Sequence, residues 1–227
     1  MRKQIFSVLG VVLVAFSFAL AGEPPQTAVA TPAAGKATDH VKLPPPNRTG
    51  GMTLTEALAN RRSVRSFTAV PLTLPEISQL LWAAQGITDG KGHRTAPSAH
   101  AAYFLHVYLV SATGLSEYLP AGHELLKLSE KDLRAALSSQ KSVAAAPVVL
   151  LVAGDYDRAT QQLGAETGQR LVNLEAGHAA QNVLLQATAL GLGAVPVGGI
   201  QPKQVQQAAS LPPSSVPIYL IPVGHPN

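Results

Sequence analysis

Residues 174–199 read LEAGHAAQNVLLQATALGLGAVPVGG. They form the later part of the longest helical pattern of the chain, from about Thr160 to Leu190, which ends at Gly191. The pattern is apolar nearly all round, and this predicts a buried helix. Small residues between Ala176 and Ala180 would let another backbone approach closely. The residues after Gly191 predict a short strand and a turn.

The flanking sequence mixes helix and strand patterns. Capping-box pairs Thr53/Glu56 and Thr73/Glu76 predict helices over 54–62 and 74–86. The apolar runs 101–110, 146–154 and 217–224 predict strands, and 131–141 and 202–209 predict helices. Residues 124–131, with alternating Glu and Lys, are interpreted as a solvated helical surface. The mixture predicts an α+β sandwich, with helices packed on a central sheet.

The N-terminal part has the composition of an export signal. Two basic residues precede the apolar run 5–21, which ends in a small-x-small pattern at Ala19-Leu20-Ala21. We expect a signal peptide over 1–21, a Pro/Ala-rich linker over 22–50 and one folded domain over 51–227. The predicted location is exported, either periplasmic or secreted, with no membrane span left after cleavage. The alternative is a retained membrane anchor.

Composition and motifs exclude several kinds of site. The chain has no cysteine, which excludes disulfides and thiolate chemistry. Its seven histidines show no metal-ligand spacing, so no metal site is predicted. The net charge of +4 includes Arg2 and Lys3, and this mild balance argues against a nucleic-acid partner. The stretch GLGAVP at 191–196 ends a helix instead of opening one, so it is no dinucleotide fingerprint.

The stretch RRSVRSF at 61–67 concentrates charge in a chain with only 13% charged residues. One cation at a helix C-terminus is explained by the helix dipole, but three are not. In an extended backbone Arg61, Ser63 and Arg65 would lie on one side, where guanidinium and hydroxyl donors suit a phosphate. From the residues alone, a phosphate site and a solvated surface are equally supported.

Five blocks of the sequence, taken in order, resemble the nitroreductase family of FMN flavoproteins. They are LTEALANRRSVRSF, PLTLPEISQLLWAAQGIT, RTAPSAHAAYFLHVYLV, LEAGHAAQNVLLQATALGLGAVPVGG and IYLIPVGHP. The similarity covers about residues 41–226, and within the family it is greatest to the SagB/ThcOx-type dehydrogenases. The resemblance implies a nitroreductase-like sandwich with a mainly antiparallel sheet. It also implies a homodimer with FMN at the subunit interface and the alanine-rich helix in the dimer core.

The resemblance also implies the cofactor-binding residues, which fall in three segments. The phosphate and ribityl segment maps onto Arg61, Arg62, Ser63 and Arg65. The segment touching the flavin ring maps onto Pro97, Ser98, Ala99 and His100. The turn at the reactive ring edge near N5 maps onto Pro196, Val197, Gly198 and Gly199, where glycine leaves room for a flat ring.

Two departures from the family pattern concern this site. Relatives often have glycine where this chain has His100, and many carry basic residues after the last strand, where this chain has none. The implied function is an FMN-dependent oxidoreductase that transfers hydride between a donor, with NAD(P)H as a candidate, and a small acceptor. The acceptor would be a nitro, quinone or azoline-type molecule. The alternatives are an exported flavin-binding protein without turnover and a flavin-consuming enzyme.

Overall fold

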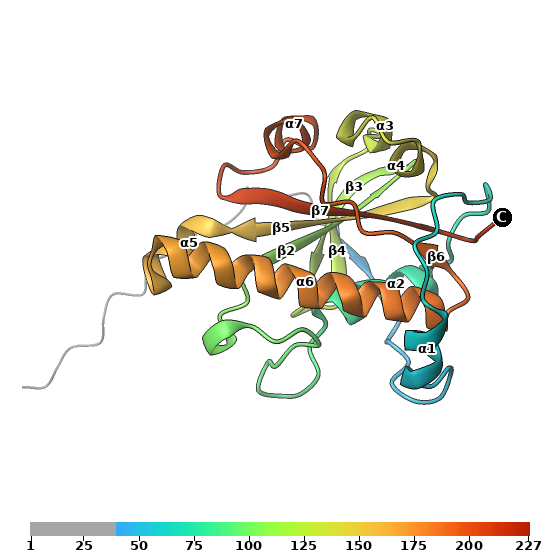
Figure 1. Ribbon diagram of the computed structural model, residues 1–227, viewed down its shortest axis with the longest axis horizontal. Coiled ribbons are helices and arrows are strands. Elements are labelled where there is room, and N and C mark those ends of the chain that lie inside the picture. The colour runs from blue at the N-terminus through green and yellow to red at the C-terminus, as the bar shows by residue number, and fades with distance from the viewer. Residues whose placement is uncertain (1–39) are drawn as a thin grey trace, which may run out of the picture. The chain divides into compact units, whose positions relative to one another are not determined.

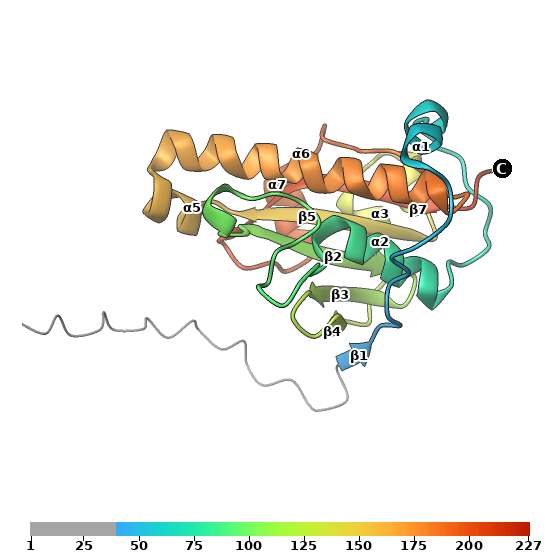
Figure 2. The same ribbon diagram turned by 90° about the horizontal axis from the view of Figure 1, so that it is seen from below.

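The apolar run that begins at Val148 forms an interior strand of an antiparallel sheet. The computed structural model describes residues 40–227. Within them the sheet has seven strands in the order β1-β4-β3-β2-β5-β7-β6, and every neighbouring pair is antiparallel. Figure 2 shows most of this order, from β5 across to β1. The strands are β1 (His40–Lys42), β2 (Leu105–Ser111), β3 (Gly114–Leu119), β4 (Glu124–Ser129), β5 (Val148–Asp155), β6 (Gly193–Ala194) and β7 (Ser215–Gly224).

Helices cover both faces of this sheet. They are α1 (Leu54–Asn60), α2 (Leu74–Gln85), α3 (Arg134–Leu137), α4 (Lys141–Ala145), α5 (Tyr156–Leu163), α6 (Ala165–Ala189) and α7 (Pro202–Ala208), with a 3₁₀ turn at Ala99–Ala101. Figure 1 shows α2 and α6 on one side of the sheet, and α3, α4 and α7 on the other. This arrangement confirms the predicted α+β sandwich.

Strand β5 is buried on both faces because each face meets a helical layer. Val148, Leu150 and Val152 join the core beneath α2 and α6. Val149 and Leu151 alternate with them and join the core beneath α3, α4 and α7. Side chains of a strand alternate between its faces, so an uninterrupted apolar run suits a strand between two layers.

The predicted capping boxes are present at the first two helices. Thr53 accepts a hydrogen bond from the Glu56 backbone and donates its own backbone N–H to the Glu56 carboxylate. Thr73 and Glu76 make the same reciprocal pair at α2. These contacts satisfy backbone donors that a helix N-terminus otherwise leaves open, and they fix where both helices begin.

The long helical pattern from Thr160 to Leu190 is divided in two. Gly164 adopts a φ of 81° between α5 and α6, a conformation that glycine reaches without steric cost. Helix α6 also differs from the predicted all-round burial. Its buried residues follow one stripe, from Gly168 through Ala176 to Ala187, whereas Leu174 on the other side is 49% exposed. In a single chain only one face of α6 therefore packs on the sheet.

The interpretation of residues 124–131 as a helical surface was wrong. Residues 124–129 form β4, which pairs with β3 as a hairpin and with β1 at its other edge. The charged residues lie along these pairings: Lys42 on β1 is 2.8 Å from the Glu124 carboxylate, and Lys127 donates to the Thr113 carbonyl. Pairing with two strands outweighs the weak helical signal of the local sequence.

The folded region reaches into the segment predicted as a linker. Strand β1 begins at His40, and Leu43 is buried in the core between the sheet and α2. The predicted signal peptide and most of the predicted linker lie outside the described residues. Among residues 40–227, no helix has the length and apolarity needed to cross a bilayer.

Candidate functional site

The arginine-rich segment leaves α1 and runs beside β6. The chain turns out of the helix at Arg61, with φ −56° and ψ 122°. Val64 donates its backbone N–H to the Ala194 carbonyl at 3.0 Å, and Ser63 forms a parallel bridge with Ala194. A Cβ added at Gly193 would lie only 2.6 Å from the Val64 side chain, so the glycine permits this close approach. The structure thus brings the segment at 61–65 next to the strand that precedes the glycine turn.

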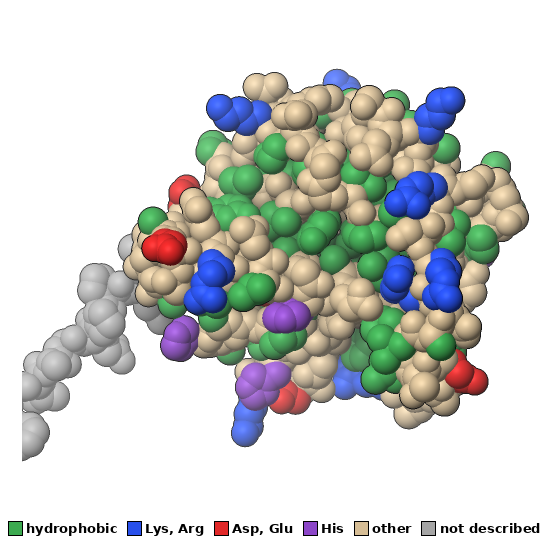
Figure 3. Space-filling model, viewed as in Figure 1, with side chains coloured by type: hydrophobic (Ala, Val, Ile, Leu, Met, Phe, Trp, Pro, Cys, Tyr) green, Lys and Arg blue, Asp and Glu red, His purple; other side chains and the backbone are tan. Residues whose placement is uncertain are grey.

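The three arginines of this segment have different surroundings. The Arg62 guanidinium donates to the carbonyl oxygens of Ala59 (2.9 Å) and Arg61 (2.8 Å), as expected of a cation at a helix C-terminus. Arg61 is half-buried and Arg65 is exposed. Within residues 40–227 neither of these two side chains makes a hydrogen bond or an ion pair. Figure 3 shows Lys and Arg side chains gathered over the end of the molecule that holds α1 and β6.

The residues after Arg65 are held by the C-terminal residues. Thr68 donates its backbone N–H to the His225 carbonyl at 2.9 Å, and Phe67 bridges to Pro226. The Asn227 side chain donates to the Ser66 hydroxyl at 2.5 Å. The segment is therefore fixed on both sides, by β6 and by the residues that follow β7.

The predicted turn at Pro196–Gly199 follows β6 and presents bare backbone. Val197 exchanges two backbone hydrogen bonds with Leu220 on β7, at 2.8 and 3.0 Å. Gly198 and Gly199 are exposed. A Cβ at Gly199 would meet nothing within 4 Å, and one at Gly198 would touch only the Tyr219 ring, at 3.2 Å. The turn is anchored at Val197 and open at its two glycines, so a flat molecule could approach its backbone.

The third predicted segment lies elsewhere in the same chain. Ser98 donates its hydroxyl to Glu175, in the first half of α6, whereas β6 begins beyond the C-terminal end of α6, near Ala187. Glu175 and Ala187 are twelve residues apart on α6, and this corresponds to about 18 Å along the helix because a helix rises about 1.5 Å per residue. Figure 1 shows the light-green turn at 99–101 near α5, and β6 at the opposite end of α6. One chain thus joins the segments at 61–65 and 196–199, but not Pro97–His100.

The sequence reasoning missed a buried polar cluster beneath Pro97–His100. The Glu175 carboxylate is 2% exposed and lies between Ser98 and the backbone N–H of Phe104. The guanidinium groups of Arg94 and Arg158 lie over the rings of Tyr103 and Phe104, at 4.6 and 5.0 Å. Burial raises the pKa of Glu175, against the hydrogen bonds from Ser98 and Phe104 and the two arginine charges, which lower it. The available signal was one acidic residue on an otherwise apolar helical stripe.

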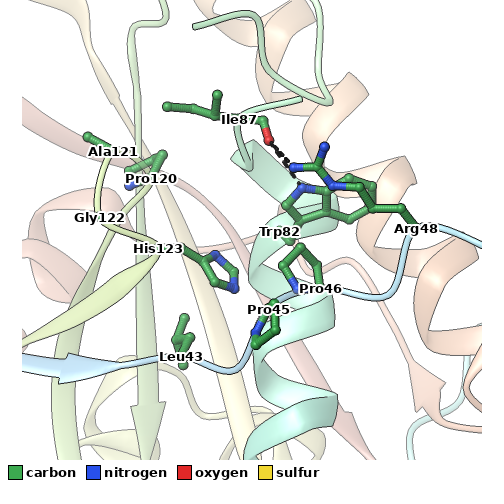
Figure 4. Close-up of a pocket in the computed structure, with 10 residues that line it drawn as sticks. All are labelled: Leu43, Pro45, Pro46, Arg48, Trp82, Ile87, Pro120, Ala121, Gly122 and His123. Carbon is green, nitrogen blue, oxygen red and sulfur yellow. Dashed lines mark hydrogen bonds between the residues drawn. The ribbon is translucent and has the colours of Figure 1, made fainter. Parts of the chain in front are cut away.

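Cavities lie beside α2, away from the twelve predicted residues. One, of about 390 Å³, is walled by prolines, Leu43, Ile87 and Trp82, with Arg48 and His123 as its polar side chains (Figure 4). Arg48 donates to the Ile87 carbonyl, as does the Trp82 indole, and both hydrogen bonds help to shape the wall. Two further cavities of about 410 and 310 Å³ lie between α2 and α6. None of the twelve predicted cofactor residues lines any of these three cavities.

Comparison with known proteins gives consistent matches. The model of the Nitroreductase family matches residues 58–225. A Methanocaldococcus jannaschii protein named among the nitroreductases is 39% identical over 181 residues, covering 75% of this chain and 90% of its own. An FMN reductase (NADPH) of Bacillus subtilis is 27% identical, covering 75% of this chain and 65% of its own.

A solved structure supports the same relationship. The crystal structure of a protein from Ralstonia eutropha JMP134, also named among the nitroreductases, has 34% sequence identity and a TM-score of 0.79. The match covers 86% of this chain and 93% of that one. The region that matches the family model includes both the arginine segment at 61–65 and the glycine turn at 196–199. The chain therefore belongs to the nitroreductase family, and it is an oxidoreductase of that family.

Proposed function

We propose that the protein is an FMN-dependent oxidoreductase that transfers hydride between a donor and a small acceptor molecule. One observation carries the proposal. Two arginine side chains without partners in the described chain flank a segment that pairs with β6, and β6 leads directly into a turn whose backbone is open at two glycines. This pairing of cations and bare backbone suits a ligand with an anionic end and a flat end.

The residues present fit the phosphate end of FMN. Guanidinium groups donate forked hydrogen bonds to phosphate oxygens and keep their charge at any physiological pH. Arg61 and Arg65 are available for this, with the Ser63 hydroxyl between them. Arg62 was predicted in the same role, but its guanidinium is engaged with the end of α1. We therefore assign the phosphate mainly to Arg61 and Arg65.

The glycine turn fits the ring end of the cofactor. Gly198 and Gly199 carry no side chain that would block the reactive edge of a ring, and the Val197–Leu220 pair holds the turn in place. When bound, FMN would supply the reversible acceptance of hydride at N5. The protein would position the ring, and cations and backbone donors near it would stabilise added negative charge.

The proposed site needs a second copy of the chain. Pro97–His100 contacts α6 at Glu175, whereas β6 follows the other end of that helix, about 18 Å further along its axis. The outward face of α6 carries Leu174, and α1 carries the exposed Leu54 and Leu58. Apolar side chains exposed to water favour association when another surface covers them. We propose a homodimer in which one copy supplies the arginines and glycines and its partner the segment at 97–100.

The substrates are proposed by class only. The relative named FMN reductase (NADPH) supports a nicotinamide donor for this chain. Nitro, quinone and azoline-type compounds are the candidate acceptors, and the SagB/ThcOx branch stays a prediction. Export to the periplasm or medium stays a prediction as well. An exported enzyme would need an electron donor there.

The decisive experiment compares arginine variants for flavin binding. We expect the purified protein to bind FMN and to be yellow. Arg61→Ala/Arg65→Ala should weaken FMN binding at least tenfold, because a hydrogen bond to a charged group contributes about 1.5–3 kcal/mol. Arg62→Ala is the matched control and should keep FMN affinity within about threefold, since a surface cation at a helix end contributes about 0.3–1 kcal/mol. Riboflavin, which lacks the phosphate, should bind all three proteins alike.

Two outcomes would contradict this proposal. A folded protein that binds no FMN would exclude flavin chemistry. Equal FMN binding by wild type and the double variant would exclude the arginine assignment.

Anaerobic titration of the FMN-loaded protein with NADH and NADPH then tests turnover. Bleaching followed by reoxidation with a quinone supports the enzyme, whereas no bleaching by any donor favours a flavin-binding protein without turnover. Irreversible loss of the flavin under oxygen would indicate a flavin-consuming enzyme.

A further inference from the structure

Glu175 is a carboxylic acid in the core of an otherwise apolar packing. It is 2% exposed, and its neighbours on the buried stripe of α6 include Val172, Ala176 and Ala179. Acidic residues are almost never this buried unless they are paired, because removing the charged form from water is costly. Its position therefore calls for a specific role.

The Glu175 carboxylate holds both ends of one loop. Its Oε2 accepts the Ser98 hydroxyl at 2.6 Å and the Phe104 backbone N–H at 3.4 Å. The Ser98 oxygen in turn accepts the Tyr103 backbone N–H at 2.9 Å. A single side chain on α6 thus ties residue 98 to residues 103 and 104.

The tied loop is strained. His100, Ala101 and Tyr103 have φ values of 54°, 53° and 52°, in the left-handed region that residues with a Cβ seldom occupy. Strain of this kind persists only where the surroundings hold it, and it clusters at functional sites. Arg158 donates to the Tyr103 carbonyl and Asp155 to the Phe104 carbonyl, so the far end of the loop has further support. The Ser98 end is joined to it through Glu175 and the Tyr103 N–H.

We propose that Glu175 is the positioning residue for the Pro97–His100 segment, acting through Ser98. This inference rests on the proposed function, in which that segment touches the flavin ring of the partner copy. The other Glu175 oxygen, Oε1, has no partner among the described residues, and the Arg94 and Arg158 guanidinium groups lie over the rings of Tyr103 and Phe104. The tie therefore needs an acceptor oxygen at Oε2, which glutamine also supplies and leucine does not.

The test compares Glu175→Leu, Glu175→Gln and Ser98→Ala in the full-length protein, with Glu166→Leu as control. Glu166 is an exposed acid in the first turn of the same helix. Glu175→Leu and Ser98→Ala should weaken binding about tenfold or more, since a lost hydrogen bond to a charged group is of that order. The loss should be equal for FMN and riboflavin, because the ring segment and not the phosphate is disturbed. Glu175→Gln keeps an acceptor oxygen but not the charge, so it should lose less affinity than Glu175→Leu, and Glu166→Leu should stay within about threefold of wild type.

A second readout does not depend on flavin. Amide hydrogen exchange over residues 98–104 should speed up in Glu175→Leu and Ser98→Ala, and stay slow in Glu175→Gln. If Glu175→Leu does not fold, the flavin affinity and the hydrogen exchange of Ser98→Ala test the inference. Unchanged exchange and unchanged binding in Ser98→Ala would overturn the inference, and so would a Glu175→Gln variant as impaired as Glu175→Leu. If wild type binds no flavin, the proposed function fails, and the exchange data alone test the tie.

Discussion

Single glycines decide how closely the parts of the site approach each other. Gly193 lets Val64 pack on β6, where a Cβ would lie 2.6 Å from that side chain. Gly199 has nothing within 4 Å of its would-be Cβ, so the space beside its backbone is open, as the proposed ring site requires. The two glycines lie six residues apart, yet one allows a close contact with a side chain and the other leaves its backbone exposed. The atoms around each glycine, and not the residue type, make this difference.

At Gly193, substitution by alanine should displace the arginine segment. The added methyl group would force Val64 away from β6, and overpacking of this kind costs about 1–3 kcal/mol. We expect a lower free energy of unfolding in urea, and weaker FMN binding because Arg61 and Arg65 move with Val64. Gly90→Ala is the control, because a Cβ at Gly90 would meet nothing within 4 Å and its backbone is not in the left-handed region. Wild-type stability and affinity in Gly193→Ala would show that the close approach does not matter.

At the scale of elements, a histidine joins three parts of the chain. His123 follows β3, where its Nδ1 accepts the Tyr118 hydroxyl at 2.9 Å. Its Nε2 lies 3.0 Å from the Pro44 carbonyl and 2.8 Å from the Ser78 hydroxyl on α2. A carbonyl can only accept, so Nε2 carries a proton. Burial lowers the pKa of His123, which favours the neutral ring with Nδ1 as an acceptor. The β3–β4 hairpin is thereby fastened to α2 and to the segment after β1.

This neutral histidine should make stability sensitive to acid. Burial lowers the pKa of His123 below 6.5, and the charges of Arg48 and Lys42 lower it further, against the hydrogen bond to Pro44. The folded state then binds the proton less readily than the unfolded chain. The contribution of His123 to the free energy of unfolding is fully present above about pH 6.5. It decreases as the pH drops toward the pKa of His123 in the folded state.

Urea unfolding from pH 8 to pH 5 measures this effect. Wild type should lose more of its free energy of unfolding across that range than His123→Gln, which cannot take up a proton. The exposed His93→Gln is the control and should stay close to the wild-type pH profile, because surface ion pairs contribute little. If His123→Gln retains the wild-type slope, the acid sensitivity arises elsewhere.

Helix α2 should depend measurably on its capping box. Thr73→Ala removes the hydroxyl that accepts the Glu76 backbone N–H, and such a change costs about 1 kcal/mol. Thermal unfolding should show a lower midpoint for Thr73→Ala, while Thr73→Ser keeps a capping hydroxyl and should stay near wild type. Equal midpoints for the alanine and serine variants would mean that the cap contributes nothing.

At the scale of the whole molecule, the exposed face of α6 is the surface that a second copy would cover. Leu174 is 49% exposed on that face, and Leu128 on β4 is 47% exposed. The two leucines differ little in exposure but lie on different elements. They therefore form a matched pair for testing association.

We expect Leu174→Glu to weaken dimer formation and Leu128→Glu to leave it intact. A charge buried at an interface without a partner is costly, so the dissociation constant should rise by about tenfold or more. Sedimentation velocity at micromolar concentration measures the fraction of dimer. FMN binding should fall together with dimerisation if both copies contribute to the site. Dissociation by Leu128→Glu alone would place the interface elsewhere.

The sequence by itself determined the elements with strong local signals. The capping boxes at Thr53 and Thr73, the apolar strand after Pro147 and the helix ending at Ala189 follow from neighbours within a few residues. The α+β architecture follows from their mixture. The ordered blocks from RRSVR to PVGG also carried the family resemblance. Each block is a local stretch of residues and can be compared with the family pattern before its contacts in the fold are known.

Only the tertiary structure decided what depends on distant partners. Residues 124–129 became a strand because β1 and β3 flank them, and Arg62 was separated from Arg61 and Arg65 by its contacts with the end of α1. The tie from Glu175 to Ser98 spans 77 positions of the chain, and no local pattern records it. Local propensity reaches a few residues along the chain, whereas pairing, burial and hydrogen bonds act between whichever residues the fold brings together.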